Sequence, residues 1–249
     1  MLKDKKIIII GASSGIGKAA AIQLSRQGAK VFLIARREDM LQSVMKELEG
    51  EGHMYQLADM NNVQAIEVLF KGVKEKFGVL DGMLYSAGMR ATMPISMLKP
   101  EKINEVMTVH FYGFIECVRQ FCKKNRFNSG ARIVVMSSIA AKCGDKGHTA
   151  YASAKGAIES AVHCLGMELA DKGVGINAVA AGMTKTEMMQ DFLDSSGEDS
   201  DAYKKILTRQ YLGLAEPKDI ADVICFLLSP TSWFITGASI PADGGYSSS

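Results

Sequence analysis

Tyr151 and Lys155 are the two side chains of this sequence whose types and spacing most directly suggest chemistry. They stand four residues apart in the stretch HTAYASAKGAIE, with only Ala152, Ser153 and Ala154 between them. On a helix, residues i and i+4 share one face, so the phenol and the ammonium could meet beside a bound ligand. An ordinary solvated helix face produces the same pair, so the pair alone does not separate catalysis from a charged surface.

The elements that must position this pair alternate along the chain. Seven apolar, strand-like runs are separated by longer amphipathic segments of helical period: KKIIII, AKVFLIA, HMYQLA, VLDGMLYSA, ARIVVMSS, VGINAVA and ASIPA. Unbroken β-branched runs such as residues 7–10 suit strands that are buried on both faces. The sequence therefore predicts an α/β fold, a Rossmann-type doubly wound sheet of about seven parallel strands with helices on both faces.

Length and composition favour one domain that handles small molecules. The 249 residues contain no linker or repeat, so we expect a single domain over residues 1–249, with a substrate-lid insertion around 183–214 whose polar part, 194–205, is mobile. A net charge of +2 does not point to nucleic acid, and no apolar run approaches the ~20 residues that span a bilayer. Five cysteines and four histidines show no metal-ligand spacing. We expect a cytoplasmic protein without a metal.

A glycine-rich turn follows the first predicted strand. The stretch GASSGIGKAAAIQL places Gly11, Gly15 and Gly17 where the strand passes into a helix. Gly11 permits a tight turn, Gly15 lets the backbone approach a pyrophosphate, and Gly17 lets the helix pack closely on the strand. The helix N-terminus offers N–H groups to an anion. Although the spacing GxxxGxG departs from GxGxxG, this context predicts a dinucleotide site.

The end of the second predicted strand indicates which dinucleotide binds. An acidic side chain there would bind a free ribose, whereas a 2′-phosphate requires a cation. The stretch VFLIARRE has Ala35 where the acid is expected, followed by Arg36 and Arg37, whose guanidinium groups suit a phosphate. Glu38 is interpreted as an acid in the first turn of the next helix. We therefore favour NADP(H) over NAD(H).

With these motifs in place, the chain resembles the short-chain dehydrogenase/reductase family in its single-domain form, over nearly its whole length. The motifs LADM, YSAG, RIVVMSS, YASAK, INAVAAGMTKTEM and ITGASIPADGG appear in the family's order, and the chain resembles the β-ketoacyl-acyl-carrier-protein reductases and related alcohol dehydrogenases. The resemblance implies that Tyr151 is the general acid/base, that Lys155 is its partner and bonds the nicotinamide ribose, and that Ser138 donates to the substrate oxygen. It also implies a homo-oligomer, a tetramer or a dimer.

The same resemblance assigns residues to the cofactor. Asp59 and Met60 would border the adenine, Ala87 and Gly88 the adenosine ribose, and Thr184 and Thr186 the nicotinamide and phosphate, although a capping or turn role is the alternative for each. The full set of expected cofactor contacts is Gly11, Ser13, Ser14, Gly15, Ile16, Gly17, Arg36, Arg37, Asp59, Met60, Ser86, Ala87, Gly88, Tyr151, Lys155, Gly182, Thr184 and Thr186.

Elementary chemistry agrees with these catalytic roles. A phenol ordinarily has a pKa near ~10, and a neighbouring ammonium favours its ionised form. We therefore expect Lys155 to lower the pKa of Tyr151. Hydride from the nicotinamide and a proton from Tyr151 would together convert a ketone into a secondary alcohol, or the reverse.

Four sites depart from the family pattern. Ile10 replaces a threonine, Ser86, with Tyr85 before it, replaces an asparagine of an Asn-Asn-Ala-Gly segment, and Ala181 replaces a proline. His110 replaces an asparagine that completes a catalytic tetrad in related enzymes. His110 either continues a proton relay to Lys155, with titration near neutral pH, or is a structural histidine satisfied by backbone or water.

The leading functional hypothesis is an NADP(H)-dependent oxidoreductase that acts on a ketone or secondary alcohol, similar to a 3-oxoacyl-(acyl-carrier-protein) reductase. Hydroxysteroid, sugar and polyol dehydrogenases are alternatives, and a catalytically impaired dinucleotide-binding regulatory subunit is an alternative of another class. The substrate pocket is expected to use apolar residues of the lid: Met188, Met189, Phe192, Leu193 and Tyr211. An acidic carrier protein would seek a basic patch, for which the candidates are Lys123, Lys124, Arg126 and Lys172.

Overall fold

The computed structural model describes residues 2–197 and 200–248, and in this part of the chain seven strands form one parallel sheet. The strands are ordered β3-β2-β1-β4-β5-β6-β7. Their bounds are β1 Lys6–Ile10, β2 Lys30–Ala35, β3 Met54–Leu57, β4 Leu80–Tyr85, β5 Phe127–Ser138, β6 Gly175–Ala181 and β7 Ser239–Ala242. Each predicted apolar run is a strand: the central strands are buried on both faces, whereas the edge strands β3 and β7 are only partly buried.

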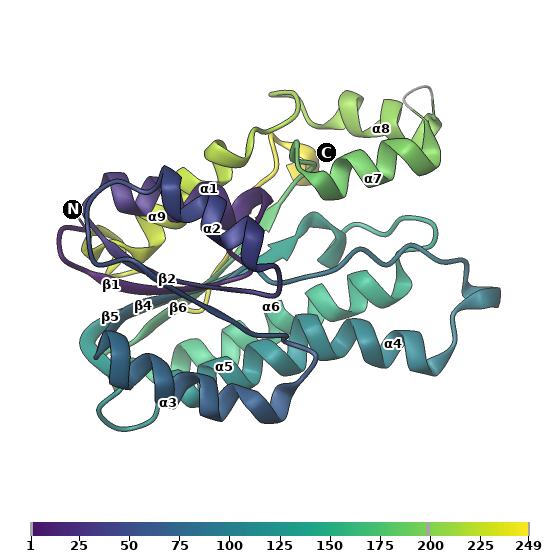
Figure 1. Ribbon diagram of the computed structural model, residues 1–249. Coiled ribbons are helices and arrows are strands. Elements are labelled where there is room, and N and C mark those ends of the chain that lie inside the picture. Colours follow the sequence, from purple (N-terminus) through teal and green to yellow (C-terminus); the bar gives the residue numbers. More distant parts are fainter. Residues whose placement is uncertain (1, 198–199, 249) are drawn as a thin grey trace.

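Helices cover both faces of the sheet, as Figure 1 shows. On one face lie α1 Gly15–Arg26, α2 Glu38–Glu47 and α9 Pro217–Leu228. On the other lie α3 Ile66–Phe77, α4 Pro100–Met107, α5 Gly113–Phe121 and α6 Thr149–Ala170. Two further helices, α7 Glu187–Ser196 and α8 Asp201–Arg209, lie beyond the sheet. The predicted doubly wound single-domain fold is confirmed.

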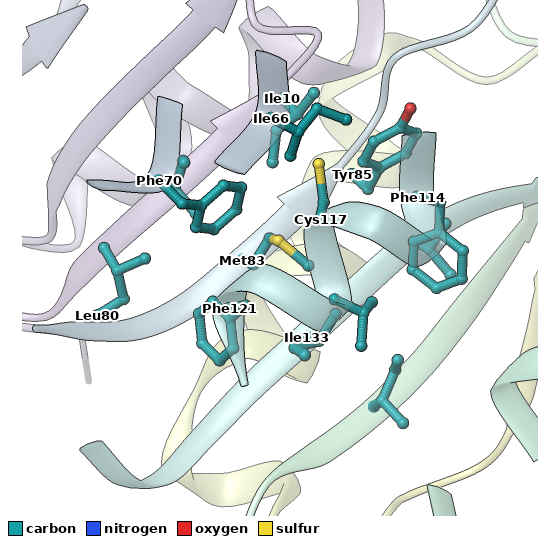
Figure 2. Packing of buried hydrophobic residues seen from close by; sticks show 14 of the residues in the cluster. Ile10, Ile66, Phe70, Leu80, Met83, Tyr85, Phe114, Cys117, Phe121 and Ile133 are labelled. Atoms are coloured by element: carbon teal, nitrogen blue, oxygen red, sulfur yellow. The ribbon is translucent and has the colours of Figure 1, made fainter. Parts of the chain in front are cut away.

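Alternate residues along the strands supply two separate cores. Ile8 and Ile10 pack toward the α3/α5 face with Phe70 and Tyr85, which Figure 2 shows from close by. Ile7 and Ile9 pack with the residues of α1, α2 and α9. The period of two along β1 therefore divides its isoleucines between the two faces.

The chain reverses its direction of winding between β1 and β4. Strands β2 and β3 extend the sheet on one side of β1, whereas β4 pairs with its other side. In doubly wound sheets, ligands bind outside the carboxyl ends of the strands at this switch point. Those strand ends lead into the glycine turn after β1, the 86–94 segment after β4, and Ser138 at the end of β5.

Two boundaries differ from the sequence-based expectation. Strand β5 begins at Phe127, four residues before the predicted run, because the polar stretch FNSG pairs beside Leu80 despite its lack of an apolar pattern. The expected lid, residues 183–214, contains α7 and α8, so most of its polar part is helical; residues 198 and 199 of that part lie outside the described residues.

Candidate active site

Ser138, Tyr151 and Lys155 converge where β5 ends and α6 begins. Ser138 is the last residue of β5, and Tyr151 lies in the first turn of α6. The Lys155 Nζ atom donates a 2.8 Å hydrogen bond to the main-chain oxygen of Met136, which ties α6 to β5. The same Nζ lies 5.5 Å from the centre of the Tyr151 ring. The Ser138 Oγ atom accepts a 3.2 Å bond from the Ala140 N–H, and the Ser138 side chain also lies within hydrogen-bonding reach of Tyr151.

Burial dominates the ionisation of this pair. It lowers the pKa of Lys155 from 10.5 to about 7, because the ammonium is removed from water. It raises the pKa of Tyr151, and the Ser138 hydroxyl opposes that rise only in part. The prediction that Lys155 lowers the pKa of Tyr151 is therefore wrong for this arrangement: desolvation weakens the charge that would have done so.

His110 lies against Tyr151, the expected general acid/base. It occupies a π-helical turn, Thr108–Tyr112, between α4 and α5, and is only 1% exposed. Its ring stands edge-on to Tyr151, with centroids 5.3 Å apart and an interplanar angle of 89°. Its Nε2 atom lies 2.9 Å from the Met89 carbonyl oxygen and 3.1 Å from the Met89 nitrogen, so the tautomer decides which bond forms. Its Nδ1 atom has no partner among the described residues.

The imidazole of His110 stays neutral. Burial, followed by the charge of Lys155, lowers the pKa of His110 to about 3. The expectation that His110 titrates near neutral pH is wrong, since a protonated ring here would be both desolvated and repelled. Contact with the Met89 backbone agrees with the structural alternative, whereas the unpartnered Nδ1 leaves a polar atom facing the site.

The glycine turn is shaped to admit a dinucleotide. Gly11 has a φ of +87°, and a Cβ there would lie 2.5 Å from the Ala87 nitrogen, so β4 approaches the turn at main-chain contact. A Cβ at Gly17 would lie 2.1 Å from the Gly11 oxygen. The N-cap residue Ser14 makes no side-chain cap, so the first amides of α1 keep their capacity for an anion. These features fit a pyrophosphate.

A small hollow lies where the adenosine is expected. Its volume is about 240 Å³, and its lining is Arg36, Leu57, Ala58 and Asp59. The Asp59 carboxylate is exposed and accepts bonds from the main chain and side chain of Asn61. Met60 does not line the hollow, because its side chain is buried in the α3/α5 core, so only its backbone is placed to border a ligand.

Charged residues beside this hollow are arranged as the sequence suggests. Arg37 Nη2 lies 3.5 Å from the Ser14 hydroxyl at the glycine turn. Glu38 is the first residue of α2 and accepts a 3.1 Å bond from the Tyr55 hydroxyl. That position supports the helix-terminus interpretation of Glu38.

The segment after β6 covers the glycine turn from the other side. A Cβ at Gly15 would lie 3.2 Å from the Thr186 methyl group. Thr184 is buried and donates to the Gly182 oxygen, and Thr186 precedes α7 without capping it through its side chain. A Cβ at Gly182 would lie 2.6 Å from Gln210 Oε1, so packing alone accounts for this glycine.

Gln210 joins the two ends of the 183–214 segment. Its Oε1 accepts from the Met183 nitrogen at 2.9 Å, and its Nε2 donates to the oxygens of Met183 at 2.9 Å and Gly213 at 2.7 Å. Main-chain bonds from Lys185 to Ala215 and from Ala215 to Met183 complete the connection. The segment therefore leaves and re-enters the fold at one point.

The apolar residues expected in the pocket do not gather around one cavity. Met189 and Leu193 line a cavity of about 650 Å³ between α7 and α1, which also touches Gly15. Phe192 instead stacks with Arg90 of the segment after β4, the guanidinium carbon being 5.5 Å from the ring centre. Tyr211 is 65% exposed and lines neither cavity.

The predicted basic patch is smaller than the sequence suggested. Arg126 is buried and donates to the oxygen atoms of Gln120, so it is not part of the surface, and that prediction is wrong. Lys123 pairs with Glu67 at 3.4 Å, whereas Lys124 and Lys172 are exposed.

Sequence reasoning missed Glu159, which lies one helical turn after Lys155. Its buried carboxylate accepts bonds from Ser137 at 2.9 Å and Ser239 at 2.7 Å, and its second oxygen is 3.9 Å from Lys142 Nζ. It thereby links α6 to β5 and β7 beside the catalytic serine. The sequence could have indicated this role, because an acid stands four residues after Lys155 and so lies on the same helix face.

Comparison with known proteins identifies the family of the chain. A family model described as enoyl-(acyl carrier protein) reductase matches residues 11–247. The (S)-acetoin-forming diacetyl reductase of Staphylococcus epidermidis is 32% identical over 97% of this chain and 98% of its own. The 3-oxoacyl-(acyl-carrier-protein) reductase of Vibrio cholerae is 29% identical over 98% of each. A short-chain dehydrogenase of Burkholderia cenocepacia, solved in complex with NADP, superposes with a TM-score of 0.90 at 25% identity over 99% of each chain.

The chain belongs to the short-chain dehydrogenase/reductase family, whose members exchange hydride between a nicotinamide dinucleotide and ketone or alcohol groups, and it is an oxidoreductase of that family. The resemblance inferred from its motifs is confirmed. In the part of the chain that the structure describes, every helix is too short or too polar to cross a bilayer.

Proposed function

We propose that this protein is an NADP(H)-dependent oxidoreductase that interconverts a ketone and a secondary alcohol. The observation that carries the proposal is the convergence of Ser138, Tyr151 and Lys155 at the carboxyl end of β5, beside a glycine turn shaped for a pyrophosphate. The cofactor and substrate classes of the similar proteins point the same way.

The chain's own residues supply proton transfer and positioning. When bound, the nicotinamide supplies or accepts the hydride. Tyr151 keeps its proton at neutral pH because burial raises its pKa, so it is poised to protonate the oxygen of a ketone that is being reduced. The Ser138 hydroxyl, which lies beside Tyr151, would donate to that oxygen and stabilise negative charge as it develops there. Lys155 holds the helix carrying Tyr151 against β5 and is placed to bond the ribose.

The preference for NADP(H) rests on Arg36, which lines the hollow expected to hold the adenosine. A guanidinium there would pair with the 2′-phosphate, and a charge-assisted bond of about 1.5–3 kcal/mol corresponds to a roughly 10- to 100-fold change in affinity. We expect Arg36→Ser to weaken NADPH binding by at least tenfold and to leave NADH binding within twofold. Lys46→Ser, an exposed change on α2, is the matched control. Equal weakening of both cofactors would overturn the preference.

The substrate is best described as similar to a 3-oxoacyl thioester carried by an acidic protein, with a hydroxysteroid, sugar or polyol as the alternative. The exposed pair Lys124 and Lys172 is the remaining basic surface of the predicted patch. Changing both to Glu is expected to lower kcat/KM for a carrier-linked thioester and not for the same acyl group on a small thiol. Equal rates for the wild type and this variant on the carrier-linked substrate would remove the carrier protein from the proposal.

The decisive experiment is an NADPH-oxidation screen over ketoacyl thioesters, ketosteroids, quinones and keto-sugars, repeated with NADH and with Tyr151→Phe as the blank. Turnover that disappears in Tyr151→Phe supports the proposal. Cofactor binding without turnover on any of these carbonyls would favour the regulatory subunit instead. A homo-oligomeric state and a cytoplasmic location complete the proposal and rest on the family pattern and the cysteine usage.

A further inference from the structure

Tyr85 makes a bond that no part of the proposed chemistry uses. It is the last residue of β4 and is 1% exposed. Its hydroxyl donates a 2.5 Å hydrogen bond to the main-chain oxygen of Val109, the residue before His110. Figure 2 shows the ring beside Phe114, with its oxygen directed away from Met83 and the rest of the cluster.

The Tyr85 bond is made to a π-helical turn of the main chain. Within Thr108–Tyr112 the helix changes register, so that the Gly113 N–H donates to Thr108, five residues back. Such a turn widens the helix and disturbs the ordinary pairing of its carbonyl groups, and π-turns persist mostly at functional sites. The Tyr85 hydroxyl supplies a buried donor to one carbonyl of this turn.

Two glycines make room for the arrangement. A Cβ at Gly113 would lie 2.6 Å from the Tyr85 hydroxyl oxygen, so any larger residue there would displace the phenol. A Cβ at Gly88 would lie 2.6 Å from Cε1 of His110, so the segment after β4 also fits closely around the imidazole. The turn is thus held from both sides by the end of β4 and the segment that follows it.

We propose that Tyr85 is a positioning residue for the reaction: by bonding the Val109 carbonyl it fixes the π-turn and sets the edge-on placement of His110 against Tyr151. Tyr85 and His110 then act together, since the phenol stabilises the turn that presents the imidazole. The catalytic consequence rests on the proposed function, whereas the placement of His110 does not.

The first test follows the His110 ring directly, without substrate. In protein with ¹⁵N-labelled histidine, Tyr85→Phe is expected to move the ring-nitrogen signals assigned to His110, because the Met89 contact and the tautomer it selects depend on the turn. Tyr112→Phe is the matched control, since Tyr112 is in the same turn and exposed. Unchanged His110 signals in a folded Tyr85→Phe protein overturn the inference, and this readout stands even if no carbonyl substrate is found.

The second test is a double-mutant cycle on turnover. Tyr85→Phe is expected to lower kcat at least fivefold with the KM for NADPH within twofold, and to lower it less than twofold when His110→Asn is already present. Equal fold-losses in both backgrounds would show that Tyr85 does not act through His110.

Should Tyr85→Phe fail to fold, Gly113→Ala replaces it, with Gly72→Ala on α3 as control. A Cβ at Gly72 has its nearest neighbour, Gln56 Oε1, at 3.7 Å. A shift of the His110 signals in Gly113→Ala and not in Gly72→Ala supports the inference, and identical spectra for both overturn it.

Discussion

Replacing Lys155 by Met is expected to stabilise the folded protein while it abolishes turnover. Lys155 is 4% exposed, and burial lowers its pKa from 10.5 to about 7. Between these two values the unfolded chain binds a proton at Lys155 that the folded protein does not. The free energy of unfolding therefore rises with pH between about 7 and 10.5, and burial of Lys155 destabilises the folded protein most near pH 7.

The size of the effect follows from the two pKa values. At about 1.4 kcal/mol per tenfold change in ionisation constant, the cost of burying Lys155 is about 4 kcal/mol at pH 7 and about 1–2 kcal/mol at pH 9.5. Methionine keeps the length of the side chain and loses the bond to the Met136 oxygen, a loss of about 1–2 kcal/mol. The net gain should be about 2–3 kcal/mol at pH 7 and close to zero at pH 9.5.

Urea unfolding of the wild type and Lys155→Met at several pH values between 7 and 9.5 measures this difference. This pH range lies above the ordinary pKa of His110, 6.5, and below the ordinary pKa of Tyr151, 10.0. In the folded protein the pKa of His110 is lowered and the pKa of Tyr151 is raised, so both move further from the range. Lys46→Met, on the exposed side of α2, is the matched control for the replacement of a lysine by methionine. A stability difference for Lys155→Met that stays constant across the window would refute the reasoning, because it would mean that the lysine keeps its ordinary pKa.

Three further changes test other parts of the site. Gly17→Ala places a Cβ 2.1 Å from a main-chain oxygen of the glycine turn, so it should cost about 1–3 kcal/mol in urea unfolding and weaken NADPH binding in a fluorescence titration; wild-type affinity would contradict this packing. Glu159→Ala removes the acceptor of two serine hydroxyls and should lower the free energy of unfolding by about 2–4 kcal/mol. Glu159→Gln keeps an acceptor and should lower it by less than about 1.5 kcal/mol. Equal losses in the two variants would mean that the hydroxyl bonds do not contribute to stability. His110→Asn should change the rate of turnover and leave its pH profile from 6 to 9 unaltered, because the pKa of His110 is about 3; a profile that moves within this range would show that the imidazole titrates there.

The fold was predictable because its determinants are local. Buried parallel strands read as unbroken apolar runs, and all seven runs became strands. The early part of β5 was not predictable, since its residues FNSG carry no apolar pattern and pair only because β4 lies beside them. Helices α7 and α8 were likewise hidden in a polar stretch whose composition is typical of a loop.

The convergence of Ser138, Tyr151 and Lys155 was predictable from the sequence, whereas their pKa values were not. Spacing on one helix brought Tyr151 and Lys155 together, and the end of a strand placed Ser138. The pKa of each group depends on how completely the surrounding elements exclude water, which a sequence does not state. The burial of Arg126 is a similar case, since its partner Gln120 belongs to the preceding helix and only the folded turn between them encloses the guanidinium.

The bonds of Gln210 bear on how this enzyme class changes its substrates. Because one buried amide joins Met183 to Gly213, the thirty residues or so between them form a closed excursion whose length and sequence are decoupled from the sheet. Ser138, Tyr151 and Lys155, the proposed proton-transfer residues, lie outside it, on β5 and α6. Helices α7 and α8 can therefore be exchanged as a unit without altering the elements that hold these three side chains.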